Sequence, residues 1–203
     1  MKKVTVLVIT CFLLSIPSLA ICGSNSNPDD WTGNIDFFLG AKALDEDDWE
    51  PVDEHSEVGL LLDFKQKSWP VSIAVDYLYS WDDDEESSYV PGYGLVNFDA
   101  DGSTSELCIG VRKIWDNFKH VRPFFGGGIA FIWAELEVEV LGVSVSDDDM
   151  GTGLWLGGGV YWTLPEHFNI GLQLRWSWAE VTLLDIDGEA GGGHAGLLLG
   201  YHW

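Results

Sequence analysis

The stretch Ile170-Gly171-Leu172-Gln173-Leu174-Arg175-Trp176 alternates large apolar residues with glycine and polar residues. A period of two is typical of a β-strand whose two faces meet different surroundings. The pattern recurs in eight segments after Trp31, where no convincing helical period is found. The eight expected strands are 33–44, 57–66, 71–81, 104–115, 121–134, 152–163, 168–179 and 193–203.

The connections between these strands alternate in length. Short turns at 67–70, 116–120 and 165–167 join strands two to three, four to five and six to seven. Long acidic segments join the others. Short turns at one end and long loops at the other are typical of up-and-down barrels in bacterial outer membranes. The sequence therefore predicts an all-β fold, an eight-stranded antiparallel up-and-down transmembrane β-barrel.

One strand face carries charges and glycines, and the other is apolar. The charged face holds four acids and five bases, a near balance that a closed interior of low dielectric requires. We therefore expect it to line the lumen. The expected polar network of the lumen is Asp36, Lys42, Asp63, Lys65, Asp76, Glu106, Arg112, Arg122 and Arg175. A soluble lipocalin-type barrel, with the apolar face inside, is the alternative.

Tryptophans concentrate at the ends of the expected strands. From Trp69 to Trp81, strand three rises roughly 30 Å at about 3.3 Å per residue and a tilt near 40°, close to an apolar band with its girdles. We expect two aromatic belts at the membrane interfaces. Their members are Trp69, Trp115, Trp162 and Trp203 near the short turns, and Trp81, Trp133 and Trp178 near the long loops. A β-sandwich with a tryptophan core is the alternative.

The chain has 203 residues and a formal net charge of −23. Such an acidic chain repels phosphate backbones, which argues against nucleic-acid binding. Of the 33 acids, 25 lie in four segments that contain no Lys or Arg. Those segments are the expected long loops 45–57, 82–103, 135–150 and 180–190. The alternation from Glu135 to Val140 suggests that the third of them extends as a β-hairpin above the membrane.

The N-terminus has the features of an export signal. A basic start, an apolar run from Val4 to Leu14 and the small residues Ser18 and Ala20 predict a signal peptide over 1–20. A polar leader is expected over 21–30 and the barrel over 31–203. Cys22 raises a lipoprotein alternative, which the bulky Ile21 before it disfavours.

Two motifs resemble a known family. Strand five, from Arg122 to Ala130, looks like the glycine-rich "PY-x-G-x-G" strand of the small OmpA/OmpX-type outer-membrane β-barrel domain family. The last strand ends on Leu199, Tyr201 and Trp203, which look like the C-terminal signal read by the barrel assembly machinery. The resemblance implies an integral protein of the bacterial outer membrane, without the periplasmic wall-binding domain of OmpA itself. OmpW-like barrels are a near alternative.

We expect a structural or surface-interaction role, with a plugged lumen and acidic extracellular loops. The expected partners are outer-membrane lipids, lipopolysaccharide, the assembly machinery and divalent cations at the acidic loops. No cofactor and no specific metal site is expected, although the segments starting at Asp99 and Asp185 resemble the start of a calcium loop. Asp-Gly pairs are also ordinary turn formers.

Two other functions stay open. An OmpW-like barrel would provide a narrow channel for small solutes. A lipid A-modifying enzyme would combine His55 of the first loop with acids and serines of 82–88. We expect no enzyme, because acyl-chain recognition requires an apolar lumen and the expected lumen is charged.

Overall fold

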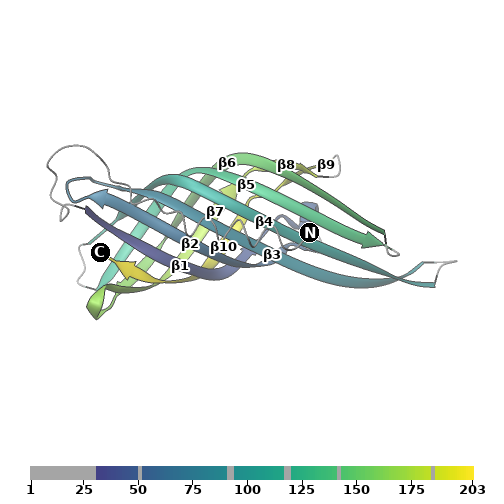
Figure 1. Ribbon diagram of the computed structural model, residues 1–203, viewed down its shortest axis with the longest axis horizontal. Coiled ribbons are helices and arrows are strands. Elements are labelled where there is room, and N and C mark those ends of the chain that lie inside the picture. The colour runs from purple at the N-terminus through teal and green to yellow at the C-terminus, as the bar shows by residue number, and fades with distance from the viewer. Residues whose placement is uncertain (1–30, 50–51, 91–93, 117–119, 141–142, 184–185) are drawn as a thin grey trace, which may run out of the picture. The chain divides into compact units, whose positions relative to one another are not determined.

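Eight antiparallel strands close into a barrel in the computed structural model, in the order β1-β10-β7-β6-β5-β4-β3-β2 (Figure 1). The structure describes residues 31–203 apart from 50–51, 91–93, 117–119, 141–142 and 184–185. The expected signal peptide (1–20) and leader (21–30) lie outside the described residues. Each barrel strand pairs with the barrel strand that comes next in the chain, and β10 returns to β1 at the seam, so the predicted up-and-down topology is confirmed. A separate two-stranded sheet, β8–β9, lies in sequence between β7 and β10.

The strands differ in length. The barrel strands are β1 (Trp31–Ala43), β2 (Glu54–Gln66), β3 (Ser72–Val90), β4 (Gly94–Ile114), β5 (Val121–Val140), β6 (Val143–Thr163), β7 (Phe168–Trp178) and β10 (Gly192–His202). The remaining elements are the short helix α2 (Glu46–Trp49), the 3-10 turn η2 (Pro165–His167) and the small hairpin β8 (Glu180–Leu183) and β9 (Ile186–Glu189).

The acidic segment 82–103 was expected as a loop, and this expectation is wrong. For 135–150, the structure has the hairpin that the alternation from Glu135 to Val140 suggests. β3 and β4 stay paired to Val90 and Gly94, and β5 and β6 to Val140 and Val143. Figure 1 shows both hairpins extending past the other strands, at the end away from the C-terminus. The hydrogen-bond ladder continues despite the charges because strand pairing uses backbone groups, which every residue except proline supplies.

The seam between β1 and β10 closes the barrel. Its register runs from Asn34 opposite His202 to Ala43 opposite Gly193. The backbone nitrogen of Trp203 donates to the carbonyl of Gly33 at 3.1 Å, which extends the seam to the last residue. Closure pairs the backbone N–H and C=O groups of the two edge strands, and a membrane-spanning sheet requires this.

The two faces of the barrel differ as the alternation predicts. Apolar side chains point outward along the strands, as at Leu154, Leu174 and Ile170, while charged and aromatic side chains are buried inside. All seven tryptophans of the two expected belts are exposed on the outside. Leu199, Tyr201 and Trp203 also face outward. An apolar exterior around a charged interior contradicts the lipocalin alternative, and one closed barrel contradicts the sandwich.

In the part of the chain that the structure describes, no helix combines the length and the apolar character needed to cross a membrane.

Candidate functional site

The centre of the lumen holds two arginines around one aspartate. Arg112 on β4 donates from Nη2 to Asp76 Oδ2 at 2.7 Å and from Nη1 to Asp63 Oδ2 at 3.3 Å. Arg175 on β7 donates from Nη2 to the same oxygen of Asp76. These side chains are buried, so removing one would leave an uncompensated charge in a region of low dielectric. The group ties β2, β3, β4 and β7 together across the lumen.

Aromatic rings pack against these arginines. The Arg112 guanidinium lies 5.3 Å from the centre of the Phe124 ring, and that of Arg175 lies 4.4 Å from the Trp155 ring. Such contacts stabilise cations that have lost water. Glycines make room for the rings: a Cβ on Gly159 would lie 2.7 Å from Phe124 Cζ. This close approach explains why glycine follows the charged face of the barrel.

A second charged group lies nearer the end of the barrel from which the two acidic hairpins project, called the acidic end below. Lys42 on β1 donates from Nζ to Glu106 Oε1 at 2.6 Å, to Thr104 Oγ1 at 2.8 Å and to the Ala190 carbonyl at 2.8 Å. Three acceptors match the three donors of an ammonium group. Lys42 therefore connects the lumen to the segment that leads from β9 into β10.

His194 extends this second group with a geometry that resembles a catalytic triad. Its Nδ1 lies 2.9 Å from Glu57 Oε1, and its Nε2 lies 3.0 Å from Ser177 Oγ. The Ser177 side chain is fully buried and lies 3.3 Å from the Glu106 carboxylate. A neighbouring carboxylate opposes negative charge on the serine oxygen, which disfavours its action as a nucleophile. The arrangement is that of a structural network.

The opposite end of the lumen is held mainly by amides. Asn34 donates from Nδ2 to Asp63 Oδ1 at 2.8 Å and accepts from Asn169 Nδ2 at 2.9 Å. Arg122 Nε donates to Asp116 Oδ1 at 2.7 Å. Asp36 is also buried here, and its Oδ1 lies 3.5 Å from Asn169 Nδ2.

The structure places eight of the nine expected network residues in the buried interior: Asp36, Lys42, Asp63, Asp76, Glu106, Arg112, Arg122 and Arg175. Lys65 differs, because it is only half-buried and makes no ion pair with the described residues. Lys65 lies one residue before the end of β2, next to the short turn. Arg122 pairs with Asp116 of a turn, outside the expected set.

Sequence reasoning missed several members of the network. The missed members are Glu57, Ser177, His194, Asn34 and Asn169. The available signal was the alternation of faces along a strand, because residues two positions apart share a face. His194 precedes Gly196 by two positions, and Glu57 precedes Gly59 by two, so both share the glycine-rich face. The pairing of residues 137 positions apart depends on barrel register, which this alternation leaves open.

Charge inside the barrel is nearly balanced among the described residues. Five buried carboxylates, on Asp36, Glu57, Asp63, Asp76 and Glu106, accompany four buried bases, on Lys42, Arg112, Arg122 and Arg175. His194, which lies between Glu57 and Glu106, supplies a fifth positive charge when it is protonated. The buried charges of the described residues are therefore close to compensating one another.

The acidic end of the barrel is covered by an apolar cap. Trp49 of α2 and Val52 are buried against Leu44, Ala179 and Val181. Trp49 Nε1 donates to the Glu189 carbonyl at 2.7 Å, and the Glu189 backbone nitrogen donates to Asp48 Oδ2 at 2.9 Å. These bonds fasten the first acidic segment to the β8–β9 hairpin over the end of the lumen.

The two long hairpins place like charges opposite one another. The register pairs Asp83 of β3 with Asp101 of β4, and Asp101 with Glu137 of β5. Glu135 of β5 faces Asp148 of β6 in the same way. Carboxylates directly opposite on neighbouring strands repel one another. The projecting sheet therefore carries carboxylates that face one another, in segments 82–103 and 135–150 that contain no Lys or Arg.

Two of the remaining candidate residues, His55 and Asp187, are held by hydrogen bonds within the fold. His55 is buried, with Nδ1 2.9 Å from Ser80 Oγ and Nε2 3.1 Å from the Val52 carbonyl, so it fastens the cap. Within the described ranges, no three His, Cys, Asp or Glu side chains are grouped so that they could hold a metal ion. Asp187, of the second calcium-like segment, accepts from Thr182 Oγ1 at 2.8 Å.

The fold is similar to those of solved outer-membrane proteins. Ail, the attachment invasion locus protein of Yersinia pestis, in complex with the heparin analogue sucrose octasulfate, matches with a TM-score of 0.59 and 15% identity, over 86% of this chain and 99% of that one. A major outer membrane protein from Thermus thermophilus matches with a TM-score of 0.52 and 10% identity, over 85% and 99%. OprG, an outer membrane protein of Pseudomonas aeruginosa, matches with a TM-score of 0.51 and 11% identity, over 85% and 95%.

No protein-family model matches the chain, and no curated protein sequence matches it. The likeness is therefore one of fold: the chain has the fold of the small outer-membrane eight-stranded barrels.

Proposed function

We propose that the protein is an integral outer-membrane barrel with a structural or surface-interaction role, in which a charge-paired plug closes the lumen and two acidic hairpins project from the cell. The observation that carries this proposal is the separation of charge. Asp63, Asp76 and Glu106 inside the barrel have basic partners, whereas Asp83, Asp101 and Glu137 of the hairpins face other carboxylates. The apolar exterior with its exposed tryptophans supports a bilayer around the barrel.

The hairpins favour positively charged partners. Divalent cations are the simplest, because they neutralise neighbouring carboxylates and can bridge them to the phosphates of lipopolysaccharide. Ail was solved with a polyanion. The projecting sheet of the present chain, with Asp83, Asp101 and Glu137 in one row, would repel such a ligand unless cations lay between them. The exposed Leu199, Tyr201 and Trp203 are in keeping with recognition by the barrel assembly machinery.

Protease added to intact cells tests location and orientation together. We expect cleavage within 82–103 and protection of the turn at 116–120. Recovery of the protein in the soluble periplasmic fraction without detergent would contradict membrane insertion, and cleavage at 116–120 alone would invert the orientation. Binding to lipopolysaccharide vesicles with Mg²⁺ and with a chelator then tests the cation bridge, which predicts binding only with Mg²⁺.

A narrow conduit is the second candidate function. It is supported by buried polar atoms of the central lumen that have no partner among the described residues: Asp76 Oδ1, Gln173 Oε1, and Nε and Nη1 of Arg175. Such atoms favour hydration of the interior.

For catalysis the discriminating assay is lipid A mass spectrometry: we expect the same acyl pattern with and without the protein, and a change that depends on His55 would contradict this.

A further inference from the structure

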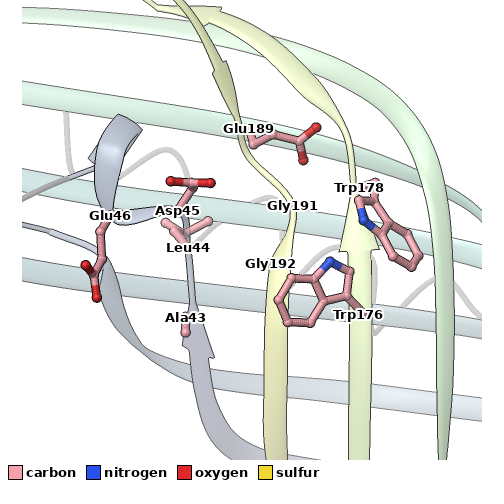
Figure 2. Close-up of a pocket in the computed structure, with 9 residues that line it drawn as sticks. All are labelled: Ala43, Leu44, Asp45, Glu46, Trp176, Trp178, Glu189, Gly191 and Gly192. Carbon is pink, nitrogen blue, oxygen red and sulfur yellow. The ribbon is translucent and has the colours of Figure 1, made fainter.

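A hollow on the outside of the barrel lies where the β1–β10 seam ends. It has a volume of about 450 Å³ and is lined by Ala43, Leu44, Asp45, Glu46, Trp176, Trp178, Glu189, Gly191 and Gly192. Figure 2 shows the two tryptophans of β7 on one side and the end of β1 with the start of α2 on the other. Between them lie Gly191 and Gly192, where β10 begins. Neither the plug of the lumen nor the acidic hairpins include this hollow.

The hollow exists because the seam opens at this point. The last pair of the β1–β10 ladder joins Ala43 to Gly193, after which Leu44 turns inward and its nitrogen donates to the Asp53 carbonyl at 2.9 Å. Gly192, the residue before Gly193, has a φ of 152°. A Cβ on Gly191 would collide with backbone atoms of Ser177 and Trp178. The floor is therefore bare backbone, and the tryptophan rings beside it stay exposed.

The walls combine aromatic rings with carboxylates. The Trp176 and Trp178 rings have centres 6.3 Å apart and planes tilted by 47°, and their side chains are 52% and 43% exposed. Asp45, Glu46 and Glu189 line the same space, and none of its nine lining residues is Lys, Arg or His. Burial raises the pKa of Glu189, and the neighbouring Glu180 carboxylate adds to this rise, so a bound cation would relieve repulsion there.

Aromatic faces next to carboxylates are suited to an ammonium group, which gains both cation–π and ionic contacts. Below the acids, the exposed Leu174 continues the apolar face of β7. Trp178 belongs to the aromatic belt, so the hollow lies at the depth of lipid head groups. We propose that this hollow is a binding site for an amphiphile with a cationic ammonium head group, whose alkyl chain lies along the outside of β7. This inference rests on the proposed membrane placement.

A titration in lipid nanodiscs tests the site. The protein is labelled with 5-fluorotryptophan and inserted into phosphatidylglycerol nanodiscs, whose lipid carries no amine. The fluorine signals of the two residues are assigned with Trp176→Phe and Trp178→Phe. Dodecyltrimethylammonium should shift both signals saturably, whereas dodecyl maltoside, with the same chain and an uncharged head, should not. Insertion is checked beforehand by protease protection, so a failure of membrane placement is distinguished from a failure of binding.

Matched variants separate the site from general charge attraction. Glu46→Gln with Glu189→Gln should raise the apparent Kd at least tenfold, whereas Glu135→Gln with Glu137→Gln, on the β5–β6 hairpin, should change it less than twofold. Trp178→Leu should also weaken binding, read at Trp176, with the carboxylates intact. Equal shifts with the maltoside, equal effects of the two acid pairs, or the same saturable shifts with Mg²⁺ alone would overturn the proposal.

Discussion

The lumen and the projecting hairpins use the same residue types under opposite conditions. In the lumen, Asp63, Asp76 and Glu106 each lie within 3.3 Å of a nitrogen of a basic side chain. In the hairpins, Asp101 lies between Asp83 and Glu137, and the segments 82–103 and 135–150 contain no Lys or Arg.

Solvation explains the difference. A buried carboxylate loses its water and must be paired within the protein, whereas an exposed one keeps water and ions close to it. The paired charges of the lumen therefore contribute to the stability of the barrel, whereas the carboxylates of the hairpins stay accessible to ions and partners in the surroundings. Changing a charge should be costly in the lumen and mild, even stabilising, in the hairpins.

The largest effect is expected at the centre of the lumen. Arg112→Met removes the cation shared by Asp63 and Asp76, and breaking a buried pair in this way costs about 3–5 kcal/mol. Urea unfolding of the barrel in lipid vesicles measures the loss. Lys113→Met is the matched control, because Lys113 donates to the Pro70 carbonyl at an exposed site, and we expect a change of about 0.5 kcal/mol or less. Equal losses in the two variants would contradict the plug.

The second effect concerns the Lys42–Glu106 pair. Lys42→Met alone should cost about 3 kcal/mol, because Glu106 is then left near Ser177 and His194 with one cation fewer. Adding Glu106→Leu should recover part of that cost, with a coupling energy of about 0.5–3 kcal/mol in the double-mutant cycle. Additive losses would show that the two side chains act independently and would remove this pair from the network.

The hairpins should respond in the opposite direction. Asp101→Thr removes the middle carboxylate of the row and should stabilise the β3–β4–β5 extension by about 0.2–1 kcal/mol. Amide exchange at 82–84 and 135–138 should slow, and added Mg²⁺ should have a smaller effect than in the unaltered protein. Glu54→Thr, opposite Ala43, is the control and should leave exchange there unchanged. Faster exchange in Asp101→Thr would contradict repulsion.

The smallest effect is a local pH dependence. The backbone N–H of Thr182 donates to Asp149 at 2.7 Å, and this bond, followed by one from Met150, lowers the pKa of Asp149 below its ordinary value of 3.8. Because the pKa of Asp149 is lowered in the folded state, its ionised carboxylate stabilises the β6–β8 contact at pH values above its ordinary pKa. This stabilisation is lost as the pH falls through the lowered pKa.

Burial, together with Asp83 and Asp84, raises the pKa of Asp82, so its protonation stabilises the hairpin as pH falls through that raised value. Amide shifts of Thr182 and Asp83 against pH separate the two responses. An unchanged Thr182 profile in Asp149→Asn would contradict the first.

The strands and their faces were predictable because each strand separates two unlike environments. Ile170 to Trp176 alternates over its whole length, and the structure buries Gly171, Gln173 and Arg175 while exposing the residues between them. The extensions of β3 and β4 were not predictable, since both faces of a projecting hairpin meet water and alternation fades. Helix α2 is four residues long and is held by Trp49 against β9, a contact that no local pattern encodes.

The candidate site was predictable by residue type and not by pairing. A balanced charged face indicated a network, and Lys42, Arg112 and Asp76 belong to it. Their partners depend on barrel register, which brings His194 to Glu57 and Ser177. Glu57 was counted with the acidic loop because its neighbours in sequence are acids, whereas its strand position turns it inward.

Conductance of the purified protein in planar lipid bilayers tests the closed lumen most directly. With Arg112, Arg175 and Lys42 paired and Trp49 and Val52 capping one end, we expect no stable ion-selective openings in the unaltered protein. Stable, ion-selective conductance of the unaltered protein would contradict the charge-paired plug and would make the narrow conduit the leading function.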